Sequence, residues 1–206
     1  MPESTKPVPA IGFLELSDIA AGIATGDALV KAAPIRMLRA GTVSGGRWLI
    51  LFGGTVGATE TAFRAGLAVA GDACRDHLFL PDIHPAVYHV LSGARTPVER
   101  EALAVLDTGA VARAIAAADA GIKGAAVTIP AVGLGAHYDG RGYVLFNGAL
   151  EDVEAAVAIA AEAVRDDGRW SVRVIPRLDP VTVRQLAGEL RFEVAPEHDL
   201  PEGERP

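Results

Sequence analysis

The sequence predicts an α+β fold made of two tandem ferredoxin-like units, each with the order β-α-β-β-α-β. The first observation is a segment that occurs twice: residues 26–33 (GDALVKAA) return as 118–125 (ADAGIKGA). Two further anchors recur in the same order, 51–54 with 145–148 and 80–85 with 175–180. Repetition at a nearly fixed spacing indicates duplicated structural units. The second observation is that strand-like and helix-like apolar patterns follow one another in that order in the first half and repeat in the second.

In the first copy, residues 11–16 form an apolar run that predicts a strand. Ser17 or Asp18 then caps a helix that runs to Ala33, because Pro34 ends it. Strands are expected over 35–40 and 47–52, joined by the glycine-containing loop 41–46. A helix over 55–71, a strand over 77–80 and a short helix over 85–91 complete the unit.

The second copy has clearer helical faces. Apolar residues at helical spacing form one buried stripe on each of its two long helices: Val111, Ile115, Ala118 and Ile122 on the first, and Val153, Val157, Ala160 and Val164 on the second. The other positions are mostly alanine, which lets the helices approach a sheet closely but leaves little side-chain volume for a ligand cavity inside a unit. Function is therefore expected at edges and loops. The second copy gains two residues between its first two anchors, and we expect this insertion in a loop.

These patterns divide the chain into a first domain over 10–95, a second domain over 100–188 and a tail over 189–206. The tail is rich in proline and acidic residues and poor in apolar residues after Val194. Such a composition predicts a mobile segment.

The composition narrows the possible functions. A net charge of -7 disfavours binding to duplex nucleic acid, which needs a basic surface. Cys74 is the only cysteine, so the chain forms no internal disulfide, and residues 1–7 lack the apolar core of a signal peptide. The apolar stretches are interrupted by charged residues before they reach membrane-spanning length. A reducing cytoplasm is the expected compartment.

The repeated anchors resemble those of bacterial microcompartment shell proteins, in which a helix ends in D-A-x-x-K-A-A and a later strand ends in an I-P-R-P-H-P turn. The chain resembles their tandem class over residues 10–188. The resemblance implies a structural protein without catalytic activity or cofactor, three copies of which form a pseudohexameric tile with a central metabolite pore. Such tiles pack laterally with hexameric and pentameric tiles into the shell of a cytoplasmic compartment, without contact with nucleic acid or membrane.

The resemblance also assigns residues to the rim of the tile, where neighbouring tiles would meet. Lys31 and Lys123 match the family lysine that reaches a neighbouring tile, and Asp27 and Asp119 lie one turn earlier, where an i,i+4 pair can hold the lysine extended. Arg177 matches a further rim contact. The alternative is a plain solvated helix pair, which the recurrence in both copies disfavours. Asp82 replaces this arginine in the first copy, which implies that alternate edges of the tile differ.

The hairpin loops of the family line the pore. The residues assigned to it are Thr42, Val43, Ser44, Gly45 and Gly46 from the first copy and Ala136, His137, Tyr138, Asp139 and Gly140 from the second. The first loop lacks a large side chain, whereas the second can both fill space and swing, which predicts a pore that opens and closes. Packing of His137 and Tyr138 on a neighbouring subunit is the alternative. Arg47 and Arg141 flank the loops, where they attract anions if they face the axis.

Three other interpretations were weighed. Asp76, His77, Asp82, His84 and His89 could ligate a metal, but their spacing matches no known ligand pattern, and His84 is expected in a packed turn. Some tandem members hold an iron–sulfur cluster on loop cysteines, whereas Cys74 lies outside both loops and is expected to be a small buried residue. Residues 52–59 could place a phosphate at a helix N-terminus, although the second copy has acidic residues there. The main alternative function is a duplicated ferredoxin-like regulatory module that binds a small effector between its domains.

Overall fold

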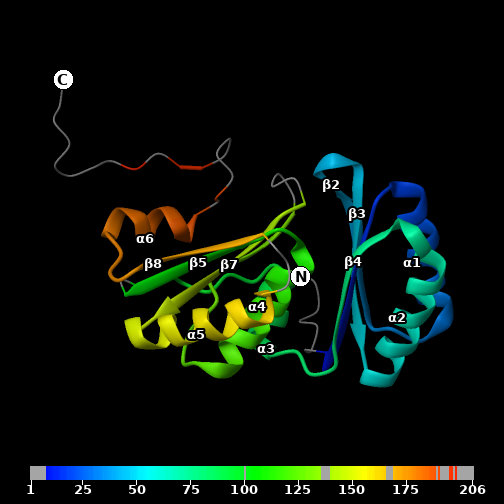
Figure 1. Cartoon of the computed structure of the whole chain (residues 1–206), viewed down its shortest axis with the longest axis horizontal. Coiled ribbons are helices and arrows are strands. Elements are labelled where there is room, and N and C mark those ends of the chain that lie inside the picture. Colours follow the sequence, from blue (N-terminus) through cyan, green and yellow to red (C-terminus); the bar gives the residue numbers. More distant parts are fainter. Residues whose placement is uncertain are drawn as a thin grey trace, which may run out of the picture.

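The computed structural model describes residues 8–99, 101–135, 140–165 and 169–188, together with residues 190, 195, 196 and 198. It contains two four-stranded antiparallel sheets, with the strand orders β2-β3-β1-β4 and β6-β7-β5-β8. Each sheet and its two long helices follow the order β-α-β-β-α-β, as the sequence predicts (Figure 1). Non-consecutive central strands of this kind are the signature of the ferredoxin-like arrangement.

The first unit begins with a strand that is buried along its whole length. Asp18 caps the first helix, since its side chain accepts a hydrogen bond from the Ala21 N–H at 2.8 Å, and the helix ends before Pro34. The elements are β1 (Ala10–Leu16), α1 (Ile19–Ala32), β2 (Met37–Val43), the 3₁₀ turn η1 (Ser44–Gly46), β3 (Arg47–Gly54), α2 (Val56–Ala70), η2 (Gly71–Ala73), β4 (Cys74–Leu80) and α3 (Pro85–Leu91).

The second unit repeats these elements, except that its hairpin is shorter in strand and longer in loop. The elements are β5 (Ala102–Thr108), α4 (Val111–Gly124), β6 (Val132–Leu134), β7 (Gly142–Gly148), α5 (Leu150–Ala163), β8 (Trp170–Ile175) and α6 (Pro180–Ala187). Thr42 pairs with Trp48 in the first hairpin, and Leu134 pairs with Gly142 in the second. The second pair is two positions further apart in the chain, so the two-residue insertion lies in the hairpin loop, as expected.

Two strands differ from the predicted bounds by three residues at one end. The strand predicted at 35–40 is β2, which starts at Met37 and continues through Val43, because the pairing with β3 runs to Val43 opposite Arg47. The strand predicted at 77–80 is β4, which starts at Cys74, where it pairs with Leu16 across a register shift. In both cases the ladder continues through residues whose side chains give no strand pattern.

The first sheet has apolar residues buried on both of its faces. Leu14, Leu16, Ile50 and Phe52 pack toward α1 and α2, whereas Ile11, Phe13 and Leu51 share a cluster with α3 and α4. Figure 1 shows α4 of the second unit between the two sheets. The sequence predicted helices on one face of each sheet only, and the second layer comes from the neighbouring unit.

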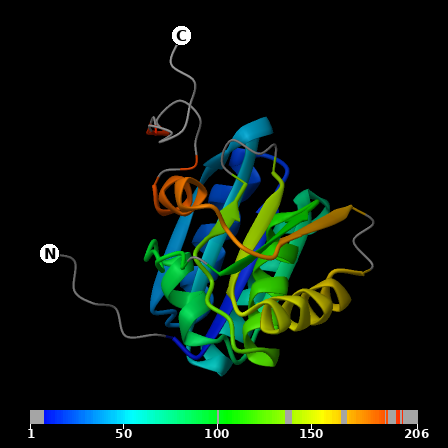
Figure 2. The same ribbon diagram turned by 90° about the vertical axis from the view of Figure 1, so that its left-hand side faces the viewer.

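The second sheet carries α4 and α5 on one face and α6 on the other (Figures 1 and 2). Beneath α6 lies a smaller cluster formed by Val98, Leu103, Leu145 and Leu178, against which Leu190 also packs. Most of the expected tail, residues 189–206, lies outside the described part of the chain, so its mobility stays a prediction. Among the described residues, no helix has the length and apolar character to cross a bilayer.

Candidate assembly surfaces and pore loops

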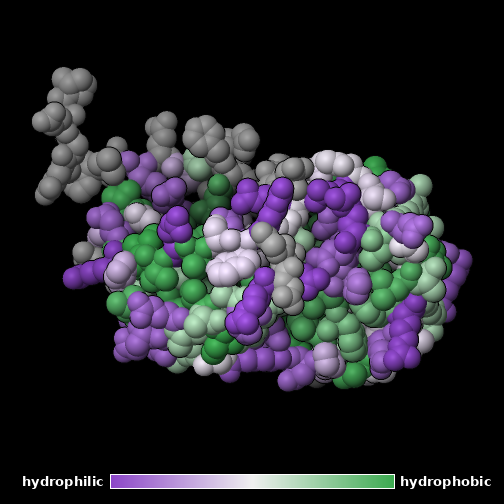
Figure 3. All heavy atoms as spheres, in the orientation of Figure 1, coloured by the Kyte–Doolittle hydropathy of each residue, from purple (hydrophilic) through white to green (hydrophobic). Residues whose placement is uncertain are grey.

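The two equivalent helices α1 and α4 present equivalent apolar stripes in different environments. On α4, Val111, Ile115 and Ala118 are fully buried, because they pack against the outer face of the first sheet. The matching positions on α1 are Ile19, Ile23 and Gly26, and this stripe continues to Val30. Ile19, Ile23 and Val30 are 44%, 58% and 49% exposed, respectively. Figure 3 shows hydrophobic residues at the surface on the side of the molecule where α1 and α2 lie.

The outer face of the second sheet is the counterpart of the surface that receives α4. In the first unit this face carries Ile11, Phe13 and Leu51, all buried. In the second unit the matching positions are Leu103, Val105 and Leu145, which belong to the cluster under α6. At the edge of this face, Ile175 of β8, which pairs with Leu103, is 38% exposed. Within the described chain, the contact of α4 with the outer face of the first sheet therefore has no equivalent on the second sheet.

Asp119 and Lys123 join the second unit to the turn that follows β4. The Lys123 ammonium lies 2.7 Å from the Asp119 carboxylate and donates to the backbone carbonyl of Asp82. Asp119 is buried and also accepts the backbone N–H of His84 at 2.7 Å. Within the chain these residues form a contact between the units, and their role at the rim of a tile stays a prediction.

Asp27 and Lys31 form the matching pair on α1, at 2.5 Å, and both side chains are exposed. The turn that corresponds to 82–84 contains Arg177 and Asp179. It precedes α6, at the opposite end of the molecule from α1 (Figure 1). Asp179 caps α6 by accepting the Val181 N–H, just as His84 caps α3 by accepting the Ala86 N–H. Each turn is thus built as a helix cap, and this local role agrees with the expectation of a packed turn for His84.

The first hairpin loop is a compact turn. Thr42 and Val43 are the last residues of β2, and Ser44, Gly45 and Gly46 form η1. Gly45 and Gly46 have φ values of 77° and 72°, a region that side chains disfavour. The glycines predicted to line a pore are therefore required by the backbone of the turn itself.

The described flanks of the second hairpin loop lie against the first unit. Its residues Ala136, His137, Tyr138 and Asp139 lie outside the described part of the chain, so the expected gate stays a prediction. Gly140 follows them with a φ of 73°, and a Cβ atom there would lie 1.7 Å from the Arg47 guanidinium. Leu134, before the loop, shares a pocket with Thr42 and Val43. The flanks of the two loops are therefore neighbours.

A buried ion pair lies beside these loops, and sequence reasoning missed it. Glu15, only 2% exposed, accepts a hydrogen bond from Arg47 at 2.9 Å, while its second oxygen has no hydrogen-bond partner among the described groups. Burial raises the pKa of the Glu15 carboxyl above its usual value, and the nearby Arg47 charge opposes this shift. One charged residue inside the apolar strand 10–16 was the signal that could have found it.

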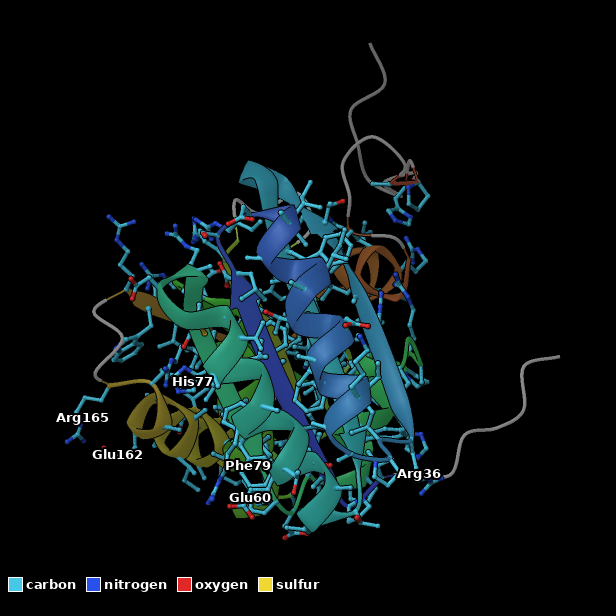
Figure 4. All side chains as sticks on the ribbon, turned by 90° about the vertical axis from the view of Figure 1, so that its right-hand side faces the viewer. Arg36, Glu60, His77, Phe79, Glu162 and Arg165 are labelled. Carbon is cyan, nitrogen blue, oxygen red and sulfur yellow. The ribbon has the colours of Figure 1, made fainter. Side chains whose placement is uncertain are left out.

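The remaining candidate residues have structural contacts of their own. The rings of His77 and Phe63 are tilted to each other with centroids 5.8 Å apart, and Phe63 also contacts Phe79. Figure 4 shows His77 and Phe79 near α2. In the described part of the chain, no group of three or more His, Cys, Asp or Glu residues is placed to hold a metal ion. Cys74 is half-buried, and burial raises the pKa of its thiol.

The helix N-terminus considered for phosphate binding has an internal partner. Thr55 precedes α2, and its hydroxyl accepts the Ala58 N–H at 3.3 Å. A helix whose first turn is capped by its own side chain has fewer free donors for an anion. The local geometry therefore gives no support to a phosphate site here.

Comparisons with known proteins agree with the duplicated organisation. The model of the BMC domain matches the chain twice, over residues 10–83 and 102–178. The bacterial microcompartment shell protein PduT of Citrobacter freundii is 38% identical over 178 residues, which cover 86% of this chain and 97% of PduT.

Two solved structures are similar in fold. A microcompartment protein from Desulfitobacterium hafniense DCB superimposes with a TM-score of 0.78 at 31% identity, over 85% of this chain and 98% of that one. The fused, permuted hexameric shell protein of the RMM microcompartment has a TM-score of 0.56 at 22% identity, over 75% of this chain and 84% of that one. The second likeness concerns the fold alone.

Proposed function

Because the chain belongs to the BMC-domain family and carries two of these domains, we propose that it is a trimeric tile of a bacterial microcompartment shell. In this proposal six similar domains from three chains form a ring around a central pore. The protein has a structural role and catalyses no reaction. Its partners are its own copies, neighbouring hexameric and pentameric tiles, and the small metabolites that cross the pore.

The observation that carries this proposal is the unequal burial of α1 and α4. Burying the stripe of α4 on the first sheet removes Val111 and Ile115 completely from water, and each buried side chain of this size contributes about 1.5–3 kcal/mol. The same stripe on α1 is left exposed at Ile19, Ile23 and Val30. The second sheet, in turn, lacks a helix from a following unit. A second copy of the chain supplies both missing partners at once.

This contact joins two different surfaces, so its repetition gives a ring when the rotation closes. If α1 of each chain docks on the second sheet of the next as α4 docks on the first sheet, the junction between chains copies the junction within the chain. Six such junctions around one axis require three chains. The hairpin loops then meet near the axis, because their flanks already lie side by side within one chain.

Light scattering coupled to gel filtration tests the ring. The expected mass is about 64 kDa, three times the 21.3 kDa of one chain. Ile23→Asp should yield a monomer, because it places a charge in the proposed junction. Val69→Asp is the matched control, since Val69 is 52% exposed on α2, outside that stripe. A monomeric wild type, or a trimeric Ile23→Asp variant, contradicts the proposal.

A further inference from the structure

A pocket of about 370 Å³ lies at the end of the second sheet, next to the first unit. Three arginines line it: Arg47 at the start of β3, Arg141 before β7 and Arg169 before β8. Trp170 and Ser171 of β8 form part of the wall, and Asp107 of β5 is the acidic residue among the lining side chains. Three positive charges thus meet one negative charge in a chain whose net charge is -7.

Internal ion pairs only partly neutralise these arginines. Arg47 donates to Glu15 through one Nη atom at 2.9 Å. Arg141 approaches the Asp107 carboxylate only to 4.0 Å, the limit for an ion pair, and its side chain is 59% exposed. A guanidinium carries five N–H donors, so a single partner leaves several of them available. Their planar fork fits the oxygens of phosphate and carboxylate groups.

The equivalent place in the first unit is filled. There Glu15 of β1 lies opposite Asp76 of β4 in the strand register, as Asp107 of β5 lies opposite Ser171 of β8 in the second unit. Arg113 of α4 reaches over this end and binds Asp76 at 2.9 Å. At this end of the first unit, an arginine from α4 of the same chain is therefore held by Asp76.

The second unit cannot be closed in the same way. The α1 position that corresponds to Arg113 is Ala21, and Ser171 stands where the first unit has Asp76. If α1 of a second copy covers this end, as in the proposed ring, it brings a methyl group where α4 brings a guanidinium. Both the side chain that would fill the pocket and the carboxylate that would hold it are missing. The pocket then persists at three of the six junctions.

We propose that this pocket binds a small oxyanion with at least two negative charges, a phosphate or a dicarboxylate, held by Arg141 and Arg169 beside Trp170. Its persistence in the assembly rests on the proposed ring, whereas its lining belongs to one chain. Arg47 and Arg141 directly follow the hairpin loops 42–46 and 136–140 that are expected to line the pore, so the pocket borders the described flanks of these loops.

The test is titration of the purified wild type, at low ionic strength, with inorganic phosphate and separately with succinate. Calorimetry should give saturable binding of one anion per chain, and the tighter ligand identifies the class. Chloride at equal ionic strength should give none. Trp170 is one of two tryptophans, so binding should change the fluorescence, and Trp170→Phe should remove that change.

Arg141→Gln and Arg169→Gln should each weaken binding roughly tenfold or more, the effect expected for losing a charge-assisted hydrogen bond. Arg64→Gln removes the same charge from the exposed face of α2 and should leave the affinity within about twofold of wild type. Equal losses in all three variants, undiminished binding by the two pocket variants, or no saturable binding by wild type would overturn the site. Light scattering on the same samples separates the two proposals: a trimer that binds no anion refutes the pocket, and a monomer that binds it refutes the ring.

Discussion

At the scale of single residues, equivalent positions in the two units have the same chemistry but different partners. Asp119 is 5% exposed and receives both the Lys123 ammonium and the His84 N–H. Asp27 has the same lysine partner on α1 but is largely exposed. The sequence identified both pairs, because an acidic residue four positions before a lysine is a local pattern. It could not show that one of them lies between the units, because that depends on a turn 35 residues away.

This difference predicts unequal effects of the same substitution. Asp119→Ala should destabilise the folded chain by about 2 kcal/mol, because it removes the acceptor of the part-buried His84 N–H and the carboxylate that pairs with Lys123. Asp27→Ala should change it by less than about 0.5 kcal/mol, because an exposed pair contributes little. Urea unfolding of both variants in the Ile23→Asp background measures chain stability apart from assembly. Equal losses would show that the contact between the units contributes nothing beyond the helical pair.

The same two variants, made in the wild-type background, probe the junction between chains. By analogy with Asp119 and His84, Asp27 should accept the Asp179 N–H of the next copy once the ring forms. Asp27→Ala should then raise the protein concentration below which the trimer dissociates, although it hardly affects the stability of the monomer. Dilution series followed by light scattering would measure this, with Asp27→Asn, which keeps an acceptor oxygen, as the milder control.

At the scale of elements, the first helix of each unit meets its sheet at equivalent positions that carry residues of different size. In the first unit Gly22 of α1 faces Trp48, and a Cβ atom at Gly22 would lie 2.2 Å from the indole. In the second unit these positions are Ala114 and Gly142, so the large residue is absent.

Gly22→Ala should therefore destabilise the chain by about 1–3 kcal/mol through overpacking, despite the better helix propensity of alanine. Gly57→Ala on α2 is the control, because a Cβ atom there meets nothing within 4 Å and should leave stability equal or slightly higher. Adding Trp48→Leu to Gly22→Ala should cost less than the sum of the two single changes. Thermal unfolding provides the four values, and strict additivity would contradict the proposed contact.

The elements themselves followed from local patterns, whereas their layers did not. Asp18, Pro34 and the apolar run 11–16 are local signals, and they placed α1 and β1 within a residue or two. The ladder of β2 and β3 extends over Gly41 and Thr42, where no side-chain pattern marks a strand. The packing of α4 on the first sheet could not be predicted from periodicity, since the same stripe is buried on α4 and exposed on α1.

At the scale of the whole molecule, two kinds of contact should build the assembly: apolar junctions within a ring and polar contacts between rings. The apolar stripe of α1 belongs to the first kind. Lys31 and Lys123 lie in the last turns of their helices, and their role at the rim of a tile stays a prediction. Lys123 also donates to the Asp82 carbonyl within the chain, so it contributes to the contact between the two units as well as to the proposed rim.

The double variant Lys31→Asp/Lys123→Asp should consequently lose lateral sheets while keeping the trimer. Reversing the charge places like charges beside Asp27 and Asp119 and removes the donors that would reach a neighbouring tile, whereas Ile19, Ile23 and Val30 still drive ring formation. Electron microscopy at low salt shows whether lateral sheets form, and light scattering measures whether the mass of the trimer is kept. Lys31→Arg/Lys123→Arg keeps the charge and should still form sheets, although less regularly, since a guanidinium and an ammonium differ in shape. If the charge-reversed variant still tiles, the lysines are ordinary surface residues. If it falls to a monomer, they hold the ring itself, and the separation into apolar junctions and polar rims is wrong.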